Sequence, residues 1–150
     1  MRRTALILTV LVSVLPLGQA AAPAAAAGNP SVVQPDALAW APAAGLPPGA
    51  EVAVLSGDPS KPGPFALRFK FPAGYQIPVH AHPTDEFVTV ISGKARMAFG
   101  KGAAETNAEP LAAGTFTILP GGAWHALWID AETIVELHST GPFGVELLAK

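Results

Sequence analysis

The chain has 150 residues, a formal net charge of -2 and no cysteine. This length suits one domain with a sizeable core, and the slight acidity, without a stripe of lysine or arginine, argues against a nucleic-acid partner. The lack of cysteine excludes disulfides and thiolate metal sites.

The N-terminal 22 residues are typical of a cleaved secretory signal peptide. Arg2 and Arg3 form a basic start, residues 5–17 form an apolar run, and the alanines at 20–22 offer a cleavage site. A membrane anchor is the alternative, but the run is shorter than the ~20 apolar residues of a spanning helix. We expect 1–22 to be removed and the mature protein to be periplasmic or extracellular, without a membrane partner.

Residues 23–50 are rich in alanine and proline, and residues 51–150 carry the strand pattern of one domain. We expect 23–50 to form an irregular N-terminal segment and arm, with Trp40 packed onto the domain. Sixteen prolines and fifteen glycines predict many turns, which favours short strands over long helices.

Short strands separated by turn residues fill the predicted domain. The clearest is 65–71, where Phe65, Leu67, Phe69 and Phe71 alternate with other residues and share one face. The other strands are predicted at 51–55, 87–91, 94–99, 115–119, 123–129, 133–138 and 145–148. This series, without a convincing helix, predicts an all-β sandwich or small barrel.

Two details of this prediction concern the middle of the chain. Ser92-Gly93 is expected to be a turn, after which Ala95, Met97 and Phe99 point inwards. Residues 100–113, rich in glycine and alanine, are expected to form a polar connection.

Three metal-ligand side chains fall within seven residues, at His80, His82 and Glu86. Residues two apart on a strand share a face, so the two imidazoles can enter one space. Glu86 is a better candidate than Asp85, because on an extended strand it lies on the same face as Val88. A histidine-rich surface loop is the alternative, but the nearby carboxylate and flanking glycines make chance an unattractive explanation.

A third imidazole would make a fuller donor set, and the sequence offers His125 and His138. His125 follows a Pro-Gly-Gly turn and shares a strand face with Leu127 and Ile129, as expected of an inward-pointing ligand. His138 is better explained as a core or rim histidine with a hydrogen bond, although it could also support a ligand from behind.

The spacing of these residues resembles the two motifs of the cupin superfamily. Gly74 is followed by His80 and His82, then Glu86 and Gly93, at the spacing of the first motif. Gly114, the Pro-Gly-Gly turn and His125 match the second motif, although Ile129 stands where the family has asparagine. That asparagine is not usually a ligand, and the stretch between the motifs has an ordinary length for the family.

The resemblance implies a cupin double-stranded β-helix, which is an antiparallel barrel of jelly-roll type. It also implies one divalent transition metal ion, held inside the barrel by His80, His82, Glu86 and His125. Three imidazoles and one carboxylate suit Mn, Fe, Co, Ni, Cu or Zn, and one or two coordination positions stay open. Glu86 would balance the charge and is the candidate catalytic base.

The space around such an ion is expected to be apolar, because no lysine or arginine has a strong claim to the interior. This favours a small, uncharged or aromatic substrate over a phosphorylated one. The candidate lining residues, most of which should simply be core, are Phe69, Val88, Val90, Met97, Phe99, Leu127 and Ile129.

Three functions are compatible with these features. The first is an exported metal-dependent oxidoreductase of dioxygenase type, which acts on a small organic molecule. The second is a non-catalytic module that binds or senses a metal or small ligand. The third, ranked lowest because of the apolar interior, is a metal-dependent isomerase or lyase.

Trp124 and Trp128 take the strand face opposite His125. They either pack beneath the 31–50 arm or form a homodimer interface, since tryptophan is enriched in such patches.

Overall fold

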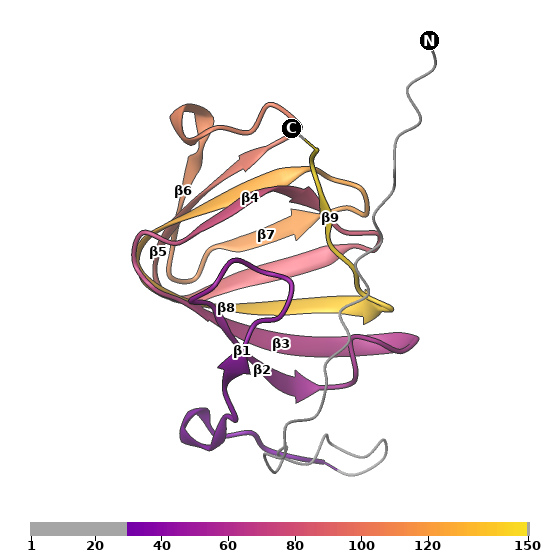
Figure 1. Ribbon diagram of the computed structural model, residues 1–150. Coiled ribbons are helices and arrows are strands. Elements are labelled where there is room, and N and C mark those ends of the chain that lie inside the picture. Colours follow the sequence, from indigo (N-terminus) through magenta and orange to yellow (C-terminus); the bar gives the residue numbers. More distant parts are fainter. Residues whose placement is uncertain (1–29, 150) are drawn as a thin grey trace.

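The computed structural model describes residues 30–149, and the predicted signal peptide lies outside this range. The regular structure of the described chain is almost entirely β (Figure 1), which confirms the predicted all-β fold class. None of its helices is long and apolar enough to cross a membrane. The strands are β1 (Ala41–Pro42), β2 (Glu51–Ser56), β3 (Gly63–Phe71), β4 (Gln76–Ala81), β5 (Glu86–Phe99), β6 (Glu109–Ala112), β7 (Phe116–Leu119), β8 (His125–Gly141) and β9 (Glu146–Leu147), with 3-10 turns η1 (Pro35–Ala37) and η2 (Glu105–Asn107).

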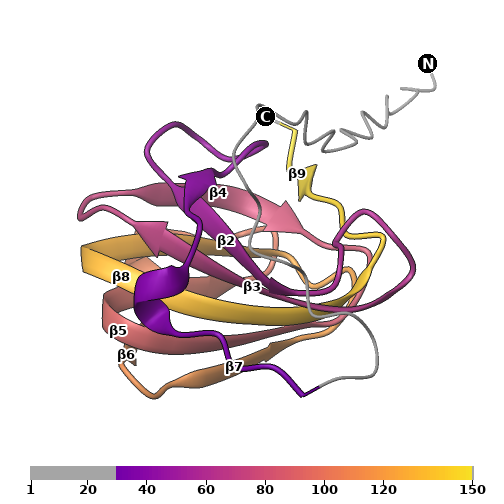
Figure 2. The ribbon, with the colours of Figure 1, turned by 90° about the horizontal axis from the view of Figure 1, so that it is seen from below.

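Two long strands, β5 and β8, form the centre of the barrel. They pair antiparallel from Glu86 opposite Ser139 to Phe99 opposite His125. The other edge of β8 pairs with β4 near its start and with β3 over its second half. The other edge of β5 pairs with β7 near its start and with β6 further along. The two central strands therefore belong to two layers at once, which curl around a common interior (Figures 1 and 2).

The bend between the layers lies at Gly93, and here the expected turn is wrong. Instead of reversing at Ser92-Gly93, the chain continues as one strand with register shifts between Val90 and Ala95. Gly93 has a φ of +89°, a left-handed conformation that suits glycine and bends the strand without ending it. Thr133 on β8 supports this bend, because its buried Oγ1 lies 3.1 Å from the Lys94 N–H that donates to it. Residues 123–138, expected as two strands, likewise lie within the single bent strand β8 apart from the first two.

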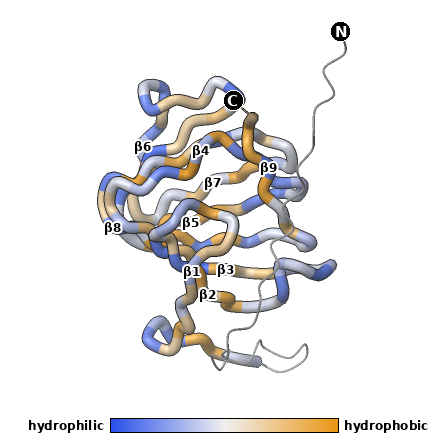
Figure 3. Tube along the Cα trace, in the orientation of Figure 1, coloured by the Kyte–Doolittle hydropathy of each residue, from blue (hydrophilic) through white to orange (hydrophobic). Residues whose placement is uncertain are grey.

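The interior is filled by side chains from both layers. Successive residues point alternately into and out of the barrel, and the hydropathy accordingly changes repeatedly along the strands (Figure 3). Phe69, Phe71 and Tyr75 stack in a row, with ring centroids 5.7 Å and 5.2 Å apart. Burial of each large apolar side chain contributes roughly 1.5–3 kcal/mol. The main cluster also contains Ile77, Val88, Val90, Met97, Leu119, Leu127, Ile129 and Val135.

Two further expectations need correction. Residues 100–113 are not only a connection, because they contain η2 and β6, and β6 extends the sheet beside β5. Phe99 does not line the interior and is 48% exposed. The alternation of β5 ends early, since Ala98 is fully buried and the chain turns at Gly100 with a φ of +86°.

The N-terminal arm lies against the barrel through part of its length. Ala43 and Ala50 are buried in the main cluster, and Leu46 packs against it. Trp40 is half-buried, and the ammonium of Lys70 lies 4.9 Å from the centroid of its ring.

Candidate metal centre

Three strand ends bring the predicted ligands together. His80 lies near the end of β4, Glu86 is the first residue of β5, and His125 is the first residue of β8. His82 follows β4 by one residue. His80 and His125 are direct partners across the β4–β8 pair, so their rings are neighbours by register. The four side chains thus meet at one end of the barrel, and each residue is at most 7% exposed.

The three imidazoles are close enough to share one ion. One ring nitrogen from each of His80, His82 and His125 lies within 4.8 Å of the other two. The ring centroid of His80 is 4.1 Å from that of His125 and 5.0 Å from that of His82. The structure therefore positions these three histidines to bind a metal.

Backbone carbonyls set the orientation of each ring. The Nδ1–H of His80 donates to the carbonyl of Pro78 at 2.7 Å. His82 donates in the same way to Gly144 at 2.8 Å, and His125 to Ala123 at 3.0 Å. With the proton held on Nδ1, the lone pair of each Nε2 is free to face the common centre, which is the tautomer that a metal needs.

The electrostatics of the site also favour neutral imidazoles. Burial lowers the pKa of His80 to about 3, with a further lowering from the neighbouring His125 and His82 rings. Burial likewise lowers the pKa of His82 to about 4 and lowers the pKa of His125. These rings remain unprotonated at neutral pH, and protons compete weakly for their Nε2 atoms.

Glu86 completes the cluster with a carboxylate that lacks a protein partner. Its Oε2 lies 3.5 Å from Nε2 of His82 and 3.5 Å from Nε2 of His125. The same oxygen is buried and has no hydrogen bond within the described chain. Because the imidazoles are neutral, these contacts are not ion pairs, and burial raises the pKa of Glu86 to about 8. A divalent cation would satisfy this oxygen and all three Nε2 lone pairs, so the residues present fit the implied metal.

Asp85, the weaker candidate ligand beside Glu86, connects the loop that follows His82 to the loop that precedes His125. Its Oδ1 accepts a hydrogen bond from the Gly121 N–H at 2.8 Å. Gly121 lies so close to Pro83 that a Cβ at this position would approach the Pro83 carbonyl oxygen to 2.8 Å. Ser139 secures the same loop, because its hydroxyl donates to the Asp85 carbonyl at 2.6 Å.

His138, the other candidate third imidazole, lies outside the cluster. Its side chain is 50% exposed, and Nε2 lies 2.9 Å from Oε1 of Glu136. The structure thus brings the side chains of His80, His82, Glu86 and His125 together and leaves His138 at the surface.

A segment near the C-terminus, which was not predicted to belong to the site, covers one of its histidines. Phe143 stacks on the His82 ring, with centroids 4.3 Å apart and planes 13° apart. Gly144 supplies the carbonyl that orients the same ring. A backbone acceptor leaves no trace in the residue types, and only the Gly-Pro-Phe-Gly spacing at 141–144 could have drawn attention to this segment.

The protons of this site give a testable prediction. We expect the metal-free protein to release about one proton when it binds a metal at pH 7. Glu86, with a pKa of about 8, is mostly protonated at that pH, and its carboxyl group must lose the proton to bind a cation. The release should fall as the pH rises through 8. Calorimetry in buffers of different ionisation enthalpy measures it, and Glu86→Gln is the control that should release none. Equal release from both proteins would contradict the assignment.

The comparisons with known proteins agree with this geometry. The family profile of the cupin domain matches residues 67–141. No curated protein matches the chain. Among solved structures, an uncharacterised conserved protein with a double-stranded β-helix domain from Klebsiella pneumoniae has 22% identity and a TM-score of 0.61, over 81% of this chain and all of that one (100%).

Two further structures share the fold at low identity. A sugar phosphate isomerase from Silicibacter pomeroyi has 16% identity and a TM-score of 0.63, over 80% of this chain and 83% of the other. A proposed acetylacetone dioxygenase from Methylibium petroleiphilum has 21% identity and a TM-score of 0.61, over 77% and 79%. The cupin profile matches half of the chain, the fold is a double-stranded β-helix, and the histidines of the two motifs lie close together. The chain therefore belongs to the cupin superfamily.

Proposed function

We propose that the protein is an exported, metal-dependent oxidoreductase of dioxygenase type that acts on a small, uncharged organic molecule. The observation that carries this proposal is the donor set itself: three neutral imidazoles and one unpartnered carboxylate in a buried interior. Such a set leaves one or two positions open on a five- or six-coordinate ion.

A bound divalent ion would supply Lewis-acid polarisation of a chelating substrate and, for a redox-active metal, the capacity to use O₂. The chain's own residues do the rest. The carbonyls of Pro78, Ala123 and Gly144 hold the three rings in one orientation. Glu86 balances the positive charge, and its carboxylate can accept the proton that an acidic substrate loses on binding.

The substrate class follows from the walls of the interior. The buried polar or charged residues of the described chain are His80, His82, Glu86, His125, Thr133 and Ser139, with no lysine or arginine among them. A phosphate group would find no cation of the protein to pair with there. An isomerase of phosphorylated sugars therefore ranks below an oxygenase of neutral enols, phenols or thiols.

O₂ consumption tests the proposal directly. The metal-free protein would be loaded separately with Fe(II), Mn(II), Co(II), Ni(II), Cu(II) and Zn(II), and assayed with an oxygen electrode against small enols, phenols and thiols. We expect turnover with the Fe or Mn form and its loss in Glu86→Gln. Absence of O₂ consumption by every metal form would refute the oxygenase assignment.

A second candidate, a non-catalytic metal-binding protein, is favoured by the closure of the site. All four ligand candidates are at most 7% exposed, and Phe143 covers His82. Water exchange separates the two functions, because a catalytic ion needs an exchangeable position. Enhanced relaxation of water protons by the Mn(II) form would support the oxidoreductase. Tight Mn(II) binding without this enhancement would support the non-catalytic metal-binding protein.

Export and self-association are also proposals. The signal peptide predicted at 1–22 should be missing from the mature protein, and N-terminal sequencing of protein recovered outside the cytoplasm tests this. A homodimer through Trp124 and Trp128 is the alternative use of the strand face that carries them, and it would double the mass measured by sedimentation at high concentration.

A further inference from the structure

A pocket on the outer face of the barrel is separate from the metal centre. It has a volume of about 360 Å³ and lies where β4, β5 and β8 run side by side. Trp128 contributes its half-buried side chain to this face, while its neighbours Leu127 and Ile129 bury theirs in the interior. The volume falls at the lower end of the range for small-ligand sites, about 300–1,000 Å³.

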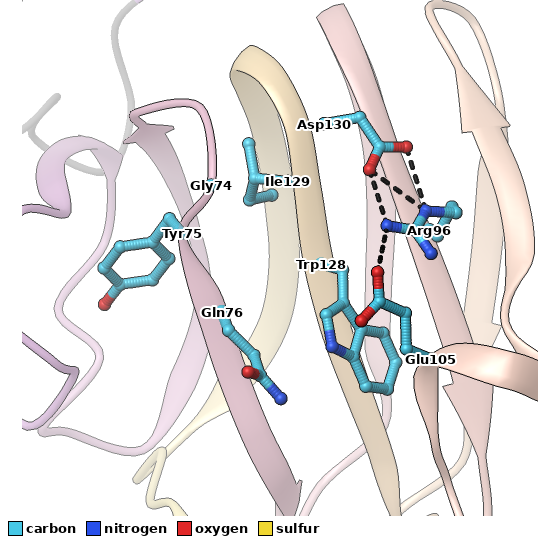
Figure 4. Close-up of a pocket in the computed structure, with 8 residues that line it drawn as sticks. All are labelled: Gly74, Tyr75, Gln76, Arg96, Glu105, Trp128, Ile129 and Asp130. Atoms are coloured by element: carbon cyan, nitrogen blue, oxygen red, sulfur yellow. Dashed lines mark hydrogen bonds and ion pairs between the residues drawn. The ribbon is translucent and has the colours of Figure 1, made fainter.

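The register of three strands builds the floor of this pocket. Trp128 on β8 is the direct partner of Gln76 on β4 and of Arg96 on β5. The three side chains therefore form one row across the sheet, with the indole in the middle, as Figure 4 shows. The exposed Gln76 places an amide, which both donates and accepts hydrogen bonds, beside the ring.

Two carboxylates bind the guanidinium of Arg96. Arg96 Nε donates to both Asp130 oxygens at 3.0 Å, and Nη2 donates to Glu105 Oε1 and Asp130 Oδ1 at 2.8 Å each (Figure 4). The cation–π contacts found in residues 30–149 involve Trp40 and Trp124, not Trp128. Within residues 30–149, Arg96 therefore makes no cation–π contact with the indole of Trp128.

The same ion pairs determine which ligands fit. Arg96 is already matched by two carboxylates, so the lining carries a net charge of about -1 and offers no free cation to a phosphate or sulfate. Yet polar capacity remains: each carboxylate keeps lone pairs, Gln76 has its amide, and Arg96 Nη1 makes no hydrogen bond with the part of the chain that is described. Arg96, Glu105 and Asp130 are held in place by their ion pairs, so a ligand would not have to order these three side chains.

We propose that this pocket binds a neutral saccharide of one or two rings, stacked on Trp128 and hydrogen-bonded by Gln76, Arg96, Glu105 and Asp130. The C–H face of a sugar ring is apolar and carries slight positive charge, which suits the negative face of an indole. Its hydroxyl groups each donate and accept, which matches a rim of amide, carboxylate and guanidinium groups. This is a second binding function, and it does not depend on the metal.

Binding can be measured on the metal-loaded protein by saturation-transfer NMR. The probes are glucose, galactose, mannose, N-acetylglucosamine, maltose and cellobiose. Affinity electrophoresis in gels that contain soluble dextran or hydroxyethylcellulose then tests whether the pocket also binds a sugar ring within a polymer. We expect millimolar affinity for at least one of them. Trp128→Ala should weaken it about tenfold or more, and Gln76→Ala, at an exposed position, about threefold to tenfold. Trp124→Ala, which changes the other half-buried tryptophan of this region, should leave it unchanged.

Three results would overturn the proposal. The first is that no saccharide binds at millimolar concentration. The second is that Trp128→Ala and Gln76→Ala, both folded by circular dichroism, bind as the unchanged protein does. The third is that a different partner occupies the pocket. That partner would be an organic cation, if tetramethylammonium binds there instead of a saccharide, or a second copy of the chain, if the protein is a dimer that Trp128→Ala dissociates.

Discussion

His125→Ala is expected to abolish stoichiometric metal binding. Removal of a group that hydrogen-bonds a metal ligand typically lowers metal affinity about 10–100-fold. The loss of a ligand itself should therefore lower it more than about 100-fold. The deletion also leaves Oε2 of Glu86 without one of its two nearest imidazole nitrogens. Metal analysis after gel filtration would show about one ion per chain before the change and below about 0.1 after it.

His138→Ala is the matched control for this experiment. His138 is a histidine of the same long strand, but its side chain is half exposed and pairs with Glu136. It should keep the full metal content. Retention of metal by folded His125→Ala, or an equal loss from both variants, would remove His125 from the ligand set.

Gly93→Ala is expected to have the largest effect on folding. A Cβ at this position would lie 2.2 Å from the Glu132 carbonyl oxygen and 2.5 Å from Thr133 Oγ1, at a φ of +89°. Backbone strain of about 1–3 kcal/mol adds to an overpacking cost of about 1–3 kcal/mol or more. Because total stability is typically about 5–15 kcal/mol, this variant should lose a large part of it in urea unfolding.

Gly114→Ala separates the two causes. Gly114 has the same φ of +89°, but a Cβ there would meet nothing within 4 Å. Only the backbone strain of about 1–3 kcal/mol applies to it. A Gly93→Ala variant no less stable than Gly114→Ala would show that the close approach of β5 and β8 at the bend is not rigid.

The core of the metal site could be predicted because period-two alternation and motif spacing are local properties of the sequence. Alternation separated Glu86, which is buried, from Asp85, which binds the Gly121 backbone instead. The same rule placed Val88, Val90, Leu127 and Ile129 inside the barrel. The full antiparallel fold followed from the two motifs together, which no single strand could have specified.

Where the prediction failed, tertiary contacts decided the outcome. Gly93 looks like a turn residue, but the long partner strand β8 keeps the chain extended past it. Phe99 follows the inward pattern of Ala95 and Met97, yet it lies where the strand ends and is 48% exposed. The carbonyl of Gly144 and the row of side chains around Trp128 depend on residues far apart in the chain, so their meeting could not be inferred from spacing.

X-ray absorption spectroscopy of the metal-loaded protein tests the central claim most directly. The account predicts a first shell of nitrogen and oxygen only, at about 2.0–2.2 Å for zinc, with the outer-shell scattering of three imidazoles. The imidazole count should fall to two in folded His80→Ala protein loaded at excess metal. A spectrum of the unchanged protein with one imidazole or none would contradict the assignment of His80, His82 and His125 to a single metal centre.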